Sequence, residues 1–401
     1  MKKIIVLGNG VQGSTVARRL CEEPRIKEVI CADYNLAVSK RLEKNLKKAK
    51  AVQVDGGRIE EILIVAKGAE LIVNALPPEF NPVVMEAALR GKMNYLDLAS
   101  GPIEGVDFVE TVKGQLALDK RFKEAGLSAL INAGSAPGIT NLLARNAYDK
   151  LDRCERIQVL LYESVWTKKF IPFWWSPSTA FRDMAAEPIV FENGSFKKVK
   201  PFSDPTIIEF KGLGARRLVH HQHEEPVTFG LTLKGLKYAG LRMGGPAVEL
   251  SESFYKLGLL SRTPLEIDGV KIAPLDLVLK LTPAAPACPE EIKEVIEGGI
   301  EVEEGAAMVR VEGTKDGKQA RFDNYMSAPG LVESFERYQV THEAFLTGQA
   351  AFLFTKLFVH DKINQKGVLV PESLSAKLRN FYFQEAAKLG IITEEVFKTR
   401  L

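Results

Sequence analysis

The stretch KKIIVLGNGVQGSTVARRL, residues 2–20, predicts how the chain begins to fold. Its first part is continuously apolar, which is typical of a buried parallel strand rather than a half-exposed one. Three glycines follow directly, at positions 8, 10 and 13. The segment after them carries apolar residues at helical spacing: Val16, Ala17 and Leu20. The stretch therefore predicts a strand, a glycine-rich turn and a helix.

This arrangement fits the phosphate-binding turn of a Rossmann dinucleotide-binding unit. Gly8 permits the tight turn, Gly10 lets the backbone approach a pyrophosphate, and Gly13 lets the helix pack closely on the strand. The helix start, with Val11 and Gln12, offers free N–H groups to the phosphate. An ordinary glycine turn is the alternative interpretation, and the wider pattern described next argues against it.

A second apolar strand, residues 27–33, ends in Asp33, 20 residues after Gly13. An acidic residue at this distance is expected to bind the ribose hydroxyls. Its carboxylate would repel the 2′-phosphate of NADP, so the sequence favours NAD as the cofactor. NADP stays possible because Lys40 and Arg41 follow on the next predicted helix, where they are either phosphate contacts or surface charges.

Strand and helix patterns continue to alternate up to residue 134. Further short apolar runs cover 51–55, 70–76, 94–99 and 128–134, with helical patterns between them at 36–48, 58–67, 81–91 and 108–125. Six strands that alternate with helices predict an α/β fold with a doubly wound parallel sheet. Ligands of such sheets bind outside the carboxyl ends of the strands.

Three groups of residues stand at those predicted strand ends. Asp55 is a candidate contact of the adenine amino group, or else only the start of an Asp-Gly-Gly turn. Ala75, Leu76 and Pro77 form a stiff segment suited to covering a cofactor, which is compatible with a proline-led helix start. Asp97 is the candidate catalytic base, because a base is needed to deprotonate an amine next to the nicotinamide; capping of the following turn is the alternative.

The second half of the chain differs in kind from the first. Alternating patterns at 155–165, 227–233 and 306–322 predict strands, the last a hairpin with a Lys-Asp-Gly turn. We therefore expect an α+β domain, with the boundary between residues 134 and 150.

Several polar residues of this half are candidates for substrate contacts. Of the arginines at 216, 217, 242 and 262, Arg242 lies between glycines and is the preferred partner of a substrate carboxylate. The segment HHQHEE, residues 220–225, holds three of the five histidines. On a strand, His221 and His223 would share a face, but no third metal ligand is evident, so we expect no metal. His223 and Glu224 facing a substrate pocket are preferred, with His223 as a second candidate catalytic residue and a solvated strand edge as the alternative. Phe173, Trp174 and Trp175 are expected in the core, with the wall of a pocket as the alternative.

Composition excludes several other classes of protein. Apolar residues make up 46% and charged residues 26% of 401 positions, and the formal net charge is only +3. We expect no nucleic-acid partner and no membrane span. The four cysteines show no paired spacing, and the chain begins with a predicted strand instead of a signal peptide. A cytoplasmic location is therefore expected.

The order of the motifs resembles the saccharopine dehydrogenase family. The likeness rests on the glycine turn, on LPPEFNPVVMEAALRGKMNYLDLA (76–99) and INAGSAPGITNLLAR (131–145), and on later segments such as HHQHEEPVTF and KGVLVPESL. It implies a Rossmann domain over 1–134, an inserted α+β domain for substrate binding and dimerisation over 135–335, and a segment over 336–401 that returns to the first domain. It also implies a homodimer.

The resemblance implies an NAD(P)-dependent oxidoreductase acting on the CH–NH bond of a lysine-derived amino acid by hydride transfer. The alternatives are an L-lysine 6-dehydrogenase, a carboxynorspermidine-type dehydrogenase acting on a polyamine, and a dinucleotide-binding regulator without turnover. Saccharopine reductases carry Cys-Gly-Leu-Asp-Pro-Gly where this chain has AGSAPG, residues 133–138. The missing cysteine and aspartate bring the sequence closer to the lysine dehydrogenase branch.

Overall fold

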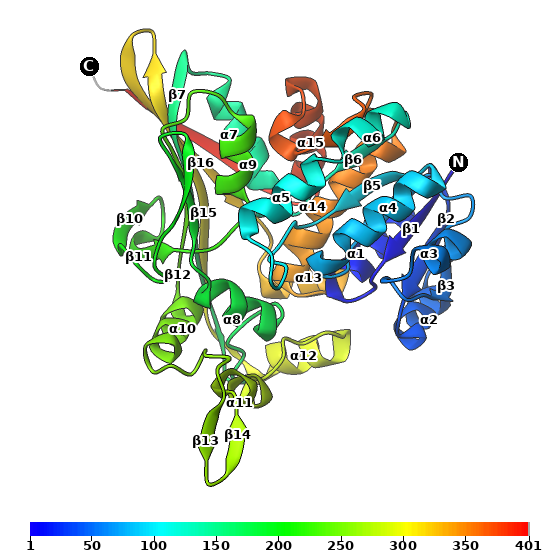
Figure 1. Ribbon diagram of the computed structural model, residues 1–401, viewed down its shortest axis with the longest axis horizontal. Helices are drawn as coiled ribbons and strands as arrows, with labels where there is room; N and C mark the ends of the chain where they lie inside the picture. Colours follow the sequence, from blue (N-terminus) through cyan, green and yellow to red (C-terminus); the bar gives the residue numbers. More distant parts are fainter. Residues whose placement is uncertain (400–401) are drawn as a thin grey trace. The chain divides into compact units, whose positions relative to one another are not determined.

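The protein folds into two compact units, which a computed structural model describes over residues 1–399 (Figure 1). Unit 1 comprises residues 1–149 and 344–392, and unit 2 comprises residues 150–343 and the chain from 393 onward. The first division, at 149/150, lies within the expected range of 134–150, and the second, at 343/344, lies after the expected residue 335. The helix over 139–148, expected in the second domain, belongs to unit 1.

Unit 1 is built on a seven-stranded sheet in which every neighbouring pair is parallel. The strand order is β17-β6-β5-β4-β1-β2-β3. The strands are β1 (Lys2–Leu7), β2 (Ile26–Asp33), β3 (Ala49–Gln53), β4 (Leu71–Asn74), β5 (Asn94–Asp97), β6 (Ser128–Leu130) and β17 (Gly367–Leu369). The predicted doubly wound α/β fold is confirmed, with one strand more than the six expected.

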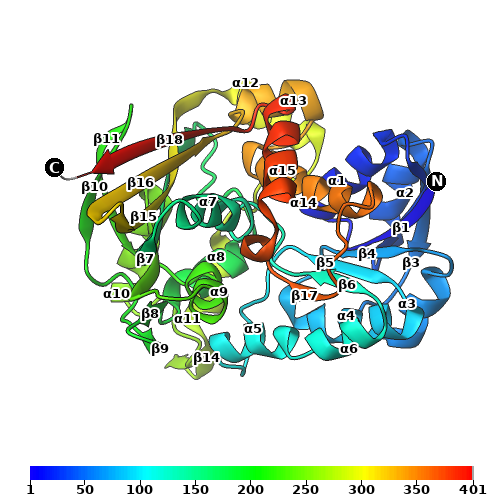
Figure 2. The same ribbon diagram turned by 90° about the horizontal axis from the view of Figure 1, so that it is seen from above.

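Helices cover both faces of this sheet (Figure 2). One layer consists of α3 (Ile59–Val65), α4 (Asn81–Gly91), α5 (Phe108–Leu116) and α6 (Asp119–Glu124). The other contains α1 (Val11–Glu22), α2 (Leu36–Asn45) and α14 (His342–Val359), and α7 (Ile139–Tyr148) and α15 (Ala376–Lys388) complete the unit. Because both faces are covered, the central strands need no polar side. All four residues of β4 are accordingly buried.

The predicted return of the C-terminal segment to the first domain is correct for most of its length. Helix α14 is apolar on all sides and almost wholly buried, as expected of a helix inside a unit. Strand β17 pairs with β6 at the end of the sheet. The last strand, β18 (Ile392–Thr399), departs from the prediction because it lies beside a strand of unit 2.

Unit 2 contains a nine-stranded mixed sheet with the order β10-β11-β12-β7-β15-β16-β18, to which β8 and β9 are attached at β12. Its strands are β7 (Arg153–Thr167), β8 (Ile189–Glu192), β9 (Ser195–Lys198), β10 (Thr206–Phe210), β11 (Gly214–His220), β12 (Tyr238–Gly244), β15 (Ile300–Lys315), β16 (Lys318–Ser327) and β18. The predicted hairpin over 306–322 is β15–β16, and its turn residues Asp316 and Gly317 both have positive φ, as a two-residue hairpin turn requires.

The helices of unit 2 are α8 (Pro177–Ala185), α9 (Glu225–Thr232), α10 (Pro246–Lys256), α11 (Pro274–Leu281), α12 (Pro289–Gly298) and α13 (Leu331–Tyr338). Helix α9 shows that the predicted strand over 227–233 is wrong. Pro226 stands in its first turn, where proline favours a helix start, and the buried Val227 and Phe229 are covered on more than one side. The alternation of apolar and polar residues there was therefore misleading.

No helix within residues 1–399 combines the length and the apolar character needed to cross a membrane.

Two helical glycines offer a test of packing in unit 1. A Cβ atom at Gly348 of α14 would lie 2.5 Å from the Thr15 methyl carbon of α1, whereas one at Gly114 of α5 would meet no atom within 4 Å. We expect Gly114→Ala to raise the free energy of unfolding by about 0.5–1 kcal/mol, as alanine in a helix should. Gly348→Ala should lower it by about 1–3 kcal/mol through overpacking. Chemical denaturation measures both, and a stabilised Gly348→Ala protein would contradict the described packing of α14 on α1.

Candidate functional site

The turn between β1 and α1 is shaped by contacts that only glycine allows. Gly8 has a φ of +81°, and a Cβ atom there would lie 2.9 Å from the backbone carbon of Ala75. A Cβ atom at Gly13 would lie 1.8 Å from the carbonyl oxygen of Gly8. At Gly10, by contrast, an added Cβ atom would meet nothing within 4 Å. The backbone is thus tightly packed on its inner side and open at Gly10, where the motif predicts the pyrophosphate.

Helix α1 begins at Val11, directly after Gly10. The first N–H groups of a helix have no partner inside it and carry a partial positive charge, which suits a phosphate. Val11 and Gln12 are only partly buried, and the side-chain Oε1 atom of Gln12 has no hydrogen-bond partner within residues 1–399. The predicted cofactor-binding residues of this turn therefore lie together, in the expected geometry.

Asp33 is held beside the glycine turn by two backbone hydrogen bonds. Its Oδ2 accepts from the N–H of Asn9 at 2.7 Å, and its Oδ1 accepts from the N–H of Asn35 at 2.8 Å. Because Asn9 lies between Gly8 and Gly10, the turn itself orients the carboxylate. Each oxygen keeps acceptor capacity for a hydroxyl group, so the arrangement suits a ribose.

A hollow of about 110 Å³ opens at the carboxyl ends of β1 and β2. Its lining consists of Leu7, Gly8, Ala32, Asp33, Tyr34, Val54, Asp55, Gly56, Leu76 and Phe80. Asp33, Asp55 and Leu76 thus converge as predicted, while Ala75 packs against Gly8 and Pro77 precedes a short 3-10 helix, Pro78–Phe80. Asp55 also forms the predicted turn, since its Oδ1 accepts from the N–H of Gly57 at 2.9 Å. Sequence analysis did not identify Tyr34 and Phe80 as lining residues.

The carboxylate of Asp97 is buried and surrounded by donors. Its Oδ1 accepts from the N–H of Asn132 at 2.8 Å, and its Oδ2 accepts from the Tyr95 hydroxyl at 2.9 Å and from Gln115 Nε2 at 2.6 Å. The side chain is 1% exposed. The sequence suggested that Asp97 lies at an open strand edge. The structure shows instead that its carboxylate is buried. It ties β5 to α5 and to the chain after β6, and this geometry favours a positioning role over that of a base.

The segment HHQHEE does not form the expected strand. Strand β11 ends at His220, and residues 221–224 form an irregular segment that leads into α9. There His223 Nδ1 lies 2.5 Å from Glu225 Oε2 and 3.4 Å from Glu224 Oε2. Burial lowers the pKa of His223, but the carboxylates of Glu225 and Glu224 outweigh this effect and raise it to about 9. His223 is therefore an imidazolium at neutral pH and does not suit the role of a base.

Asp183 belongs to the same cluster, although sequence analysis did not single it out. Burial and the neighbouring charge of Glu224 raise the pKa of its carboxyl to about 7. Its Oδ1 atom is buried and has no hydrogen-bond partner within the described chain. We refer to Asp183, His223, Glu224 and Glu225 as the acidic cluster. Its residues come from α8 and from the chain that leads into α9, and the positive charges of His223 and of the neighbouring Arg182 act on its carboxyl groups.

The acidic cluster also offers ligand atoms of the type that metals bind. One atom each of His223, Glu224 and Glu225 lies within 4.8 Å of the others. The Nδ1 atom of His223 faces the Glu225 carboxylate at 2.5 Å, so a metal ion would have to displace this ion pair together with its proton. His221, the other histidine of the predicted pair, has a ring centroid 6.1 Å from that of His223. The expectation that this segment binds no metal stays a prediction.

Arg242 lies on β12 with both terminal NH₂ groups engaged, while its Nε atom has no hydrogen-bond partner within residues 1–399. The guanidinium donates to the carbonyl oxygen and to the carboxylate of Asp204, and lies 2.9 Å from His220 Nε2. It is 4% exposed. The hydrogen bond with Arg242, and its positive charge, lower the pKa of Asp204. A substrate carboxylate would have to compete with Asp204, so the role of Arg242 in substrate binding stays a prediction.

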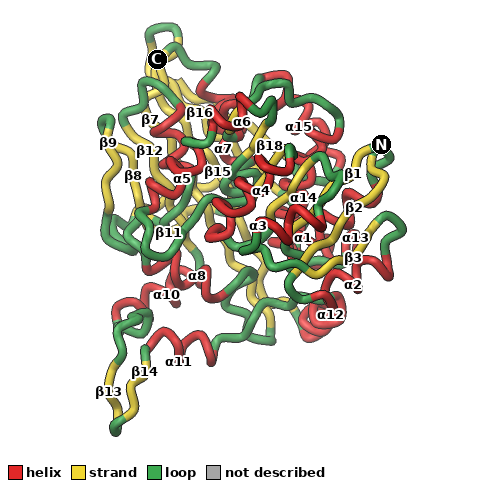
Figure 3. The backbone as a smooth tube through the Cα atoms, turned by 45° about the vertical axis from the view of Figure 1, so that its right-hand side comes forward, coloured by secondary structure: helices red, strands yellow, loops and turns green. Residues whose placement is uncertain are grey.

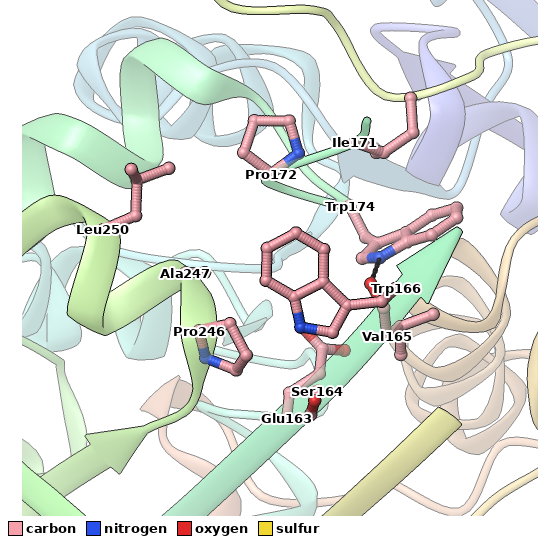
Figure 4. A pocket seen from close by; sticks show the side chains of 10 residues that line it. All are labelled: Glu163, Ser164, Val165, Trp166, Ile171, Pro172, Trp174, Pro246, Ala247 and Leu250. Atoms are coloured by element: carbon pink, nitrogen blue, oxygen red, sulfur yellow. Dashed lines mark hydrogen bonds between the residues drawn. The ribbon is translucent and has the colours of Figure 1, made fainter. Parts of the chain in front are cut away.

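A second hollow lies among the aromatic residues of unit 2 (Figure 4). Its walls include Trp166, Trp174 and Pro246, and its volume of about 20 Å³ has room for about one water molecule. Trp174 Nε1 donates to the carbonyl oxygen of Val165 at 3.3 Å. Phe173 and Trp174 are buried, as predicted for core residues, whereas Trp175 is partly buried. Trp174 also lines the hollow, which is the alternative role. This hollow is too small for a substrate.

Cofactor preference is the first functional test. We expect the protein to bind NAD more tightly than NADP, because the fixed carboxylate of Asp33 repels a 2′-phosphate. Asp33→Ser should narrow the affinity ratio by about tenfold, equivalent to roughly 1.4 kcal/mol. Fluorescence titration with NADH and NADPH measures the two affinities and so their ratio. Asp55→Asn, in the same hollow, is the matched control and should leave this ratio unchanged. An equal affinity of the wild type for both cofactors would contradict the role of Asp33.

Asp97→Asn tests the positioning role of that carboxylate. The new amide would place an NH₂ group among donors, so we expect the free energy of unfolding to fall by about 2 kcal/mol. Chemical denaturation measures this loss, and Glu124→Gln on the exposed surface of unit 1 should change stability by less than about 0.5 kcal/mol. Unchanged stability with a strongly reduced turnover would instead restore Asp97 as the catalytic base.

Comparison with known proteins agrees with this architecture. Residues 4–130 match the saccharopine dehydrogenase NADP binding domain, and residues 134–391 match the saccharopine dehydrogenase C-terminal domain. Carboxynorspermidine synthase of Vibrio alginolyticus is 26% identical over 83% of this chain and 80% of the relative, and carboxyaminopropylagmatine dehydrogenase of Synechocystis sp. is 23% identical over 93% of each.

Solved structures share the fold. Apo saccharopine dehydrogenase (L-Glu forming) from Saccharomyces cerevisiae has a TM-score of 0.70 at 16% identity, and the similarity covers 99% of this chain and 100% of that one. Homospermidine synthase from Legionella pneumophila, in complex with NAD, has a TM-score of 0.69 at 12% identity over 99% and 91% of the two chains. Since the two family models together span nearly all of the sequence, the chain belongs to the saccharopine dehydrogenase family of NAD(P)-dependent oxidoreductases.

Proposed function

We propose that the protein is a dehydrogenase acting on the CH–NH bond of a secondary amine that joins a carboxylate-bearing portion to a polyamine. Oxidation of such a bond removes a hydride, which NAD(P)⁺ accepts, and a proton from the nitrogen. One water molecule then divides the imine into a carbonyl compound and an amine, and the reverse sequence joins them. A lysine-derived amino acid, as in saccharopine, is the second candidate substrate.

The proposal of a polyamine substrate is based on the acidic cluster. Glu224 and Glu225 are 4% and 0% exposed, and buried carboxyl groups need positive partners. His223 supplies a positive charge to Glu224 and Glu225, and Arg182 contributes another beside Asp183. An ammonium group of a polyamine would supply another, with Asp183 as its partner. Saccharopine has more carboxylates than a carboxylated polyamine has, so it would place less positive charge in such a site.

The names of the sequence relatives support the same substrate class. Carboxynorspermidine and carboxyaminopropylagmatine are both carboxylated polyamine-type molecules, and the relatives that carry these names extend over most of the chain. These identities of 23–26% support the class of substrate and leave the individual molecule to experiment.

We assign the role of proton acceptor to Asp183. A carboxyl group with a pKa of about 7 is well matched to proton transfer near neutral pH. His223, with a pKa of about 9, remains charged through this range and pairs with the carboxyl groups of Glu225 and Glu224. Glu224 retains the substrate-binding role that the sequence suggested, while His223 becomes a positioning residue.

A substrate panel tests this function. We expect absorbance of reduced nicotinamide to appear with carboxynorspermidine or carboxyaminopropylagmatine, and weaker or no turnover with saccharopine and lysine. Asp183→Asn should lower kcat/KM by about 100-fold, while Glu209→Gln, an exposed carboxyl on β10, should leave it unchanged. Turnover of saccharopine alone would favour the second candidate. Binding of NAD without turnover of any of these amines would favour a dinucleotide-binding regulator.

The pH dependence gives an independent check of Asp183. Below pH 7 its carboxyl is protonated and neither accepts a proton nor pairs with an ammonium, so kcat/KM should rise as the pH passes through about 7. Asp183→Asn should remove this rise of kcat/KM with pH. A pH profile of kcat/KM without an inflection near pH 7 would contradict the assignment of Asp183.

The pKa of His223 also makes the stability of the fold depend on pH. Because the folded-state pKa of His223 is raised above 6.5, its contribution to stability is complete below pH 6.5 and is lost as the pH rises through about 9.

A further inference from the structure

Arg242 is enclosed by the protein, but its anionic partner is not. The guanidinium donates to the carbonyl oxygen and to the carboxylate of Asp204, and the residue is 4% exposed. The side chain of Asp204, by contrast, is 69% exposed. A buried charge needs an opposite charge beside it. Because the carboxylate that meets this need stands in water, a carboxylate from solution can compete for its place.

The backbone that presents Asp204 is strained. Phe202 and Asp204 have φ values of +56° and +51°, in the left-handed region, which is costly above all for a bulky residue such as phenylalanine. Phe202 is nonetheless buried in a core cluster of unit 2, with its ring centroid 5.5 Å from that of Tyr255. Such strained positions are frequent at ligand clamps. The core thus anchors the turn, and only the Asp204 side chain has to rotate to leave Arg242.

Two buried nitrogen atoms next to this ion pair have no hydrogen-bond partner within residues 1–399. They are Nε of Arg242 and Nδ1 of His220. Burial and the charge of Arg242 lower the pKa of His220 to about 4, so its ring is neutral at pH 7. Arg242 donates to Nε2 of this ring at 2.9 Å, which places the ring proton on Nδ1. Both atoms are therefore donors, and the site has more donors than Asp204 satisfies.

A second arginine, Arg156, extends the site along the sheet. Its guanidinium carbon lies 4.0 Å from the ring centroid of Tyr238, the residue opposite it on β12. Arg156 pairs with Glu312 at 3.7 Å, and Glu192, whose carboxyl it also affects, is already paired with a lysine. The charge of Arg156 is thus balanced by its surroundings, and the balance of the site depends on Arg242.

Asp204 is the one carboxylate within residues 1–399 that pairs with Arg242. When its side chain turns into the solvent, one positive charge is left without a partner. A single carboxylate group restores the balance, whereas a doubly charged phosphate exceeds it. The planar guanidinium also matches the two oxygens of a carboxylate, because it presents two parallel N–H groups. The site therefore suits a carboxylate.

These residues lie on the face of the sheet that points away from α8. Strands β11 and β12 are neighbours (Figure 3), with His220 opposite Arg242 and Val219 opposite Met243. Val219 and Met243 pack in one core cluster with α8. Since side chains alternate along a strand, His220 and Arg242 point to the other face. The site is therefore separate from the acidic cluster, whose Asp183 belongs to α8.

We infer that Arg242 and Arg156 bind one carboxylate group of a small molecule in the place that the Asp204 side chain occupies. We call this place the carboxylate site. The Tyr238 hydroxyl also reaches toward it, because the ring extends along β12 over Gly240, where an added Cβ atom would lie 2.5 Å from the hydroxyl oxygen. The inference is an alternative to the predicted role of Arg242 in substrate binding, and it does not depend on the proposed reaction.

Nuclear magnetic resonance of the full chain, with isotope-labelled arginine side chains, tests the carboxylate site during titration with sodium propionate. The Nε–H signal that disappears in Arg242→Lys is assigned to Arg242. In the wild type we expect this signal to shift with propionate until it saturates, and not to shift with sodium chloride at equal ionic strength. Asp204→Gly removes the competing carboxylate, and glycine adopts a positive φ without strain. Saturation should then occur at a propionate concentration about tenfold lower.

Two further variants control for charge. Arg156→Gln leaves the pair of Arg242 with Asp204 intact and should weaken propionate binding by about tenfold. Glu209→Gln removes an exposed carboxylate on β10 and should leave propionate binding unchanged. The absence of a saturable shift in the wild type, an unchanged saturation point in Asp204→Gly, or tighter binding of inorganic phosphate than of propionate would each overturn the inference.

Discussion

The close contact between Gly13 and the carbonyl oxygen of Gly8 is the constraint on which unit 1 depends. A Cβ atom would lie 1.8 Å from that oxygen, so α1 approaches β1 only because position 13 is glycine. This approach directs the first N–H groups of α1 above the end of β1. The same turn contributes the N–H of Asn9, which fixes the carboxylate of Asp33. One backbone contact therefore places both the phosphate-binding and the ribose-binding elements, and the parallel sheet supplies a rigid base for them.

Two aspartates show how environment separates structural from chemical roles. Asp97 accepts hydrogen bonds from Tyr95, Gln115 and Asn132, and these three donors from separate segments hold its side chain in one position. Asp183 is subject to burial and the charge of Glu224, which raise its pKa to about 7. A carboxyl that changes charge near neutral pH is suited to acid–base chemistry. The cationic character of amine substrates is consistent with this acidic surrounding.

The sequence predicted most of unit 1, because long apolar runs and a glycine motif leave few alternatives. Strand β17 was missed, since Gly367–Leu369 is too short to show a period. In unit 2 the prediction failed where local pattern and tertiary burial disagree: residues 227–233 alternate like a strand, yet Pro226 and burial on several sides favour α9. Asp97 was recognised as special, but its donors Gln115 and Asn132 come from distant segments. Asp183 gave no signal at all, because its neighbours are brought together only by the fold.

The proposed reaction transfers a hydride to or from the carbon of a C–N bond in a carboxylated polyamine. The most direct measurement is mass spectrometry of the secondary amine formed in the reductive direction, from an amino-acid aldehyde and a diamine with nicotinamide cofactor fully deuterated at C4. We expect a secondary amine that carries one deuterium on the former aldehyde carbon, which is bonded to nitrogen in the product. With Asp183→Asn we expect almost no product. Absence of the condensed amine, or an amine without deuterium, would contradict the proposed reaction.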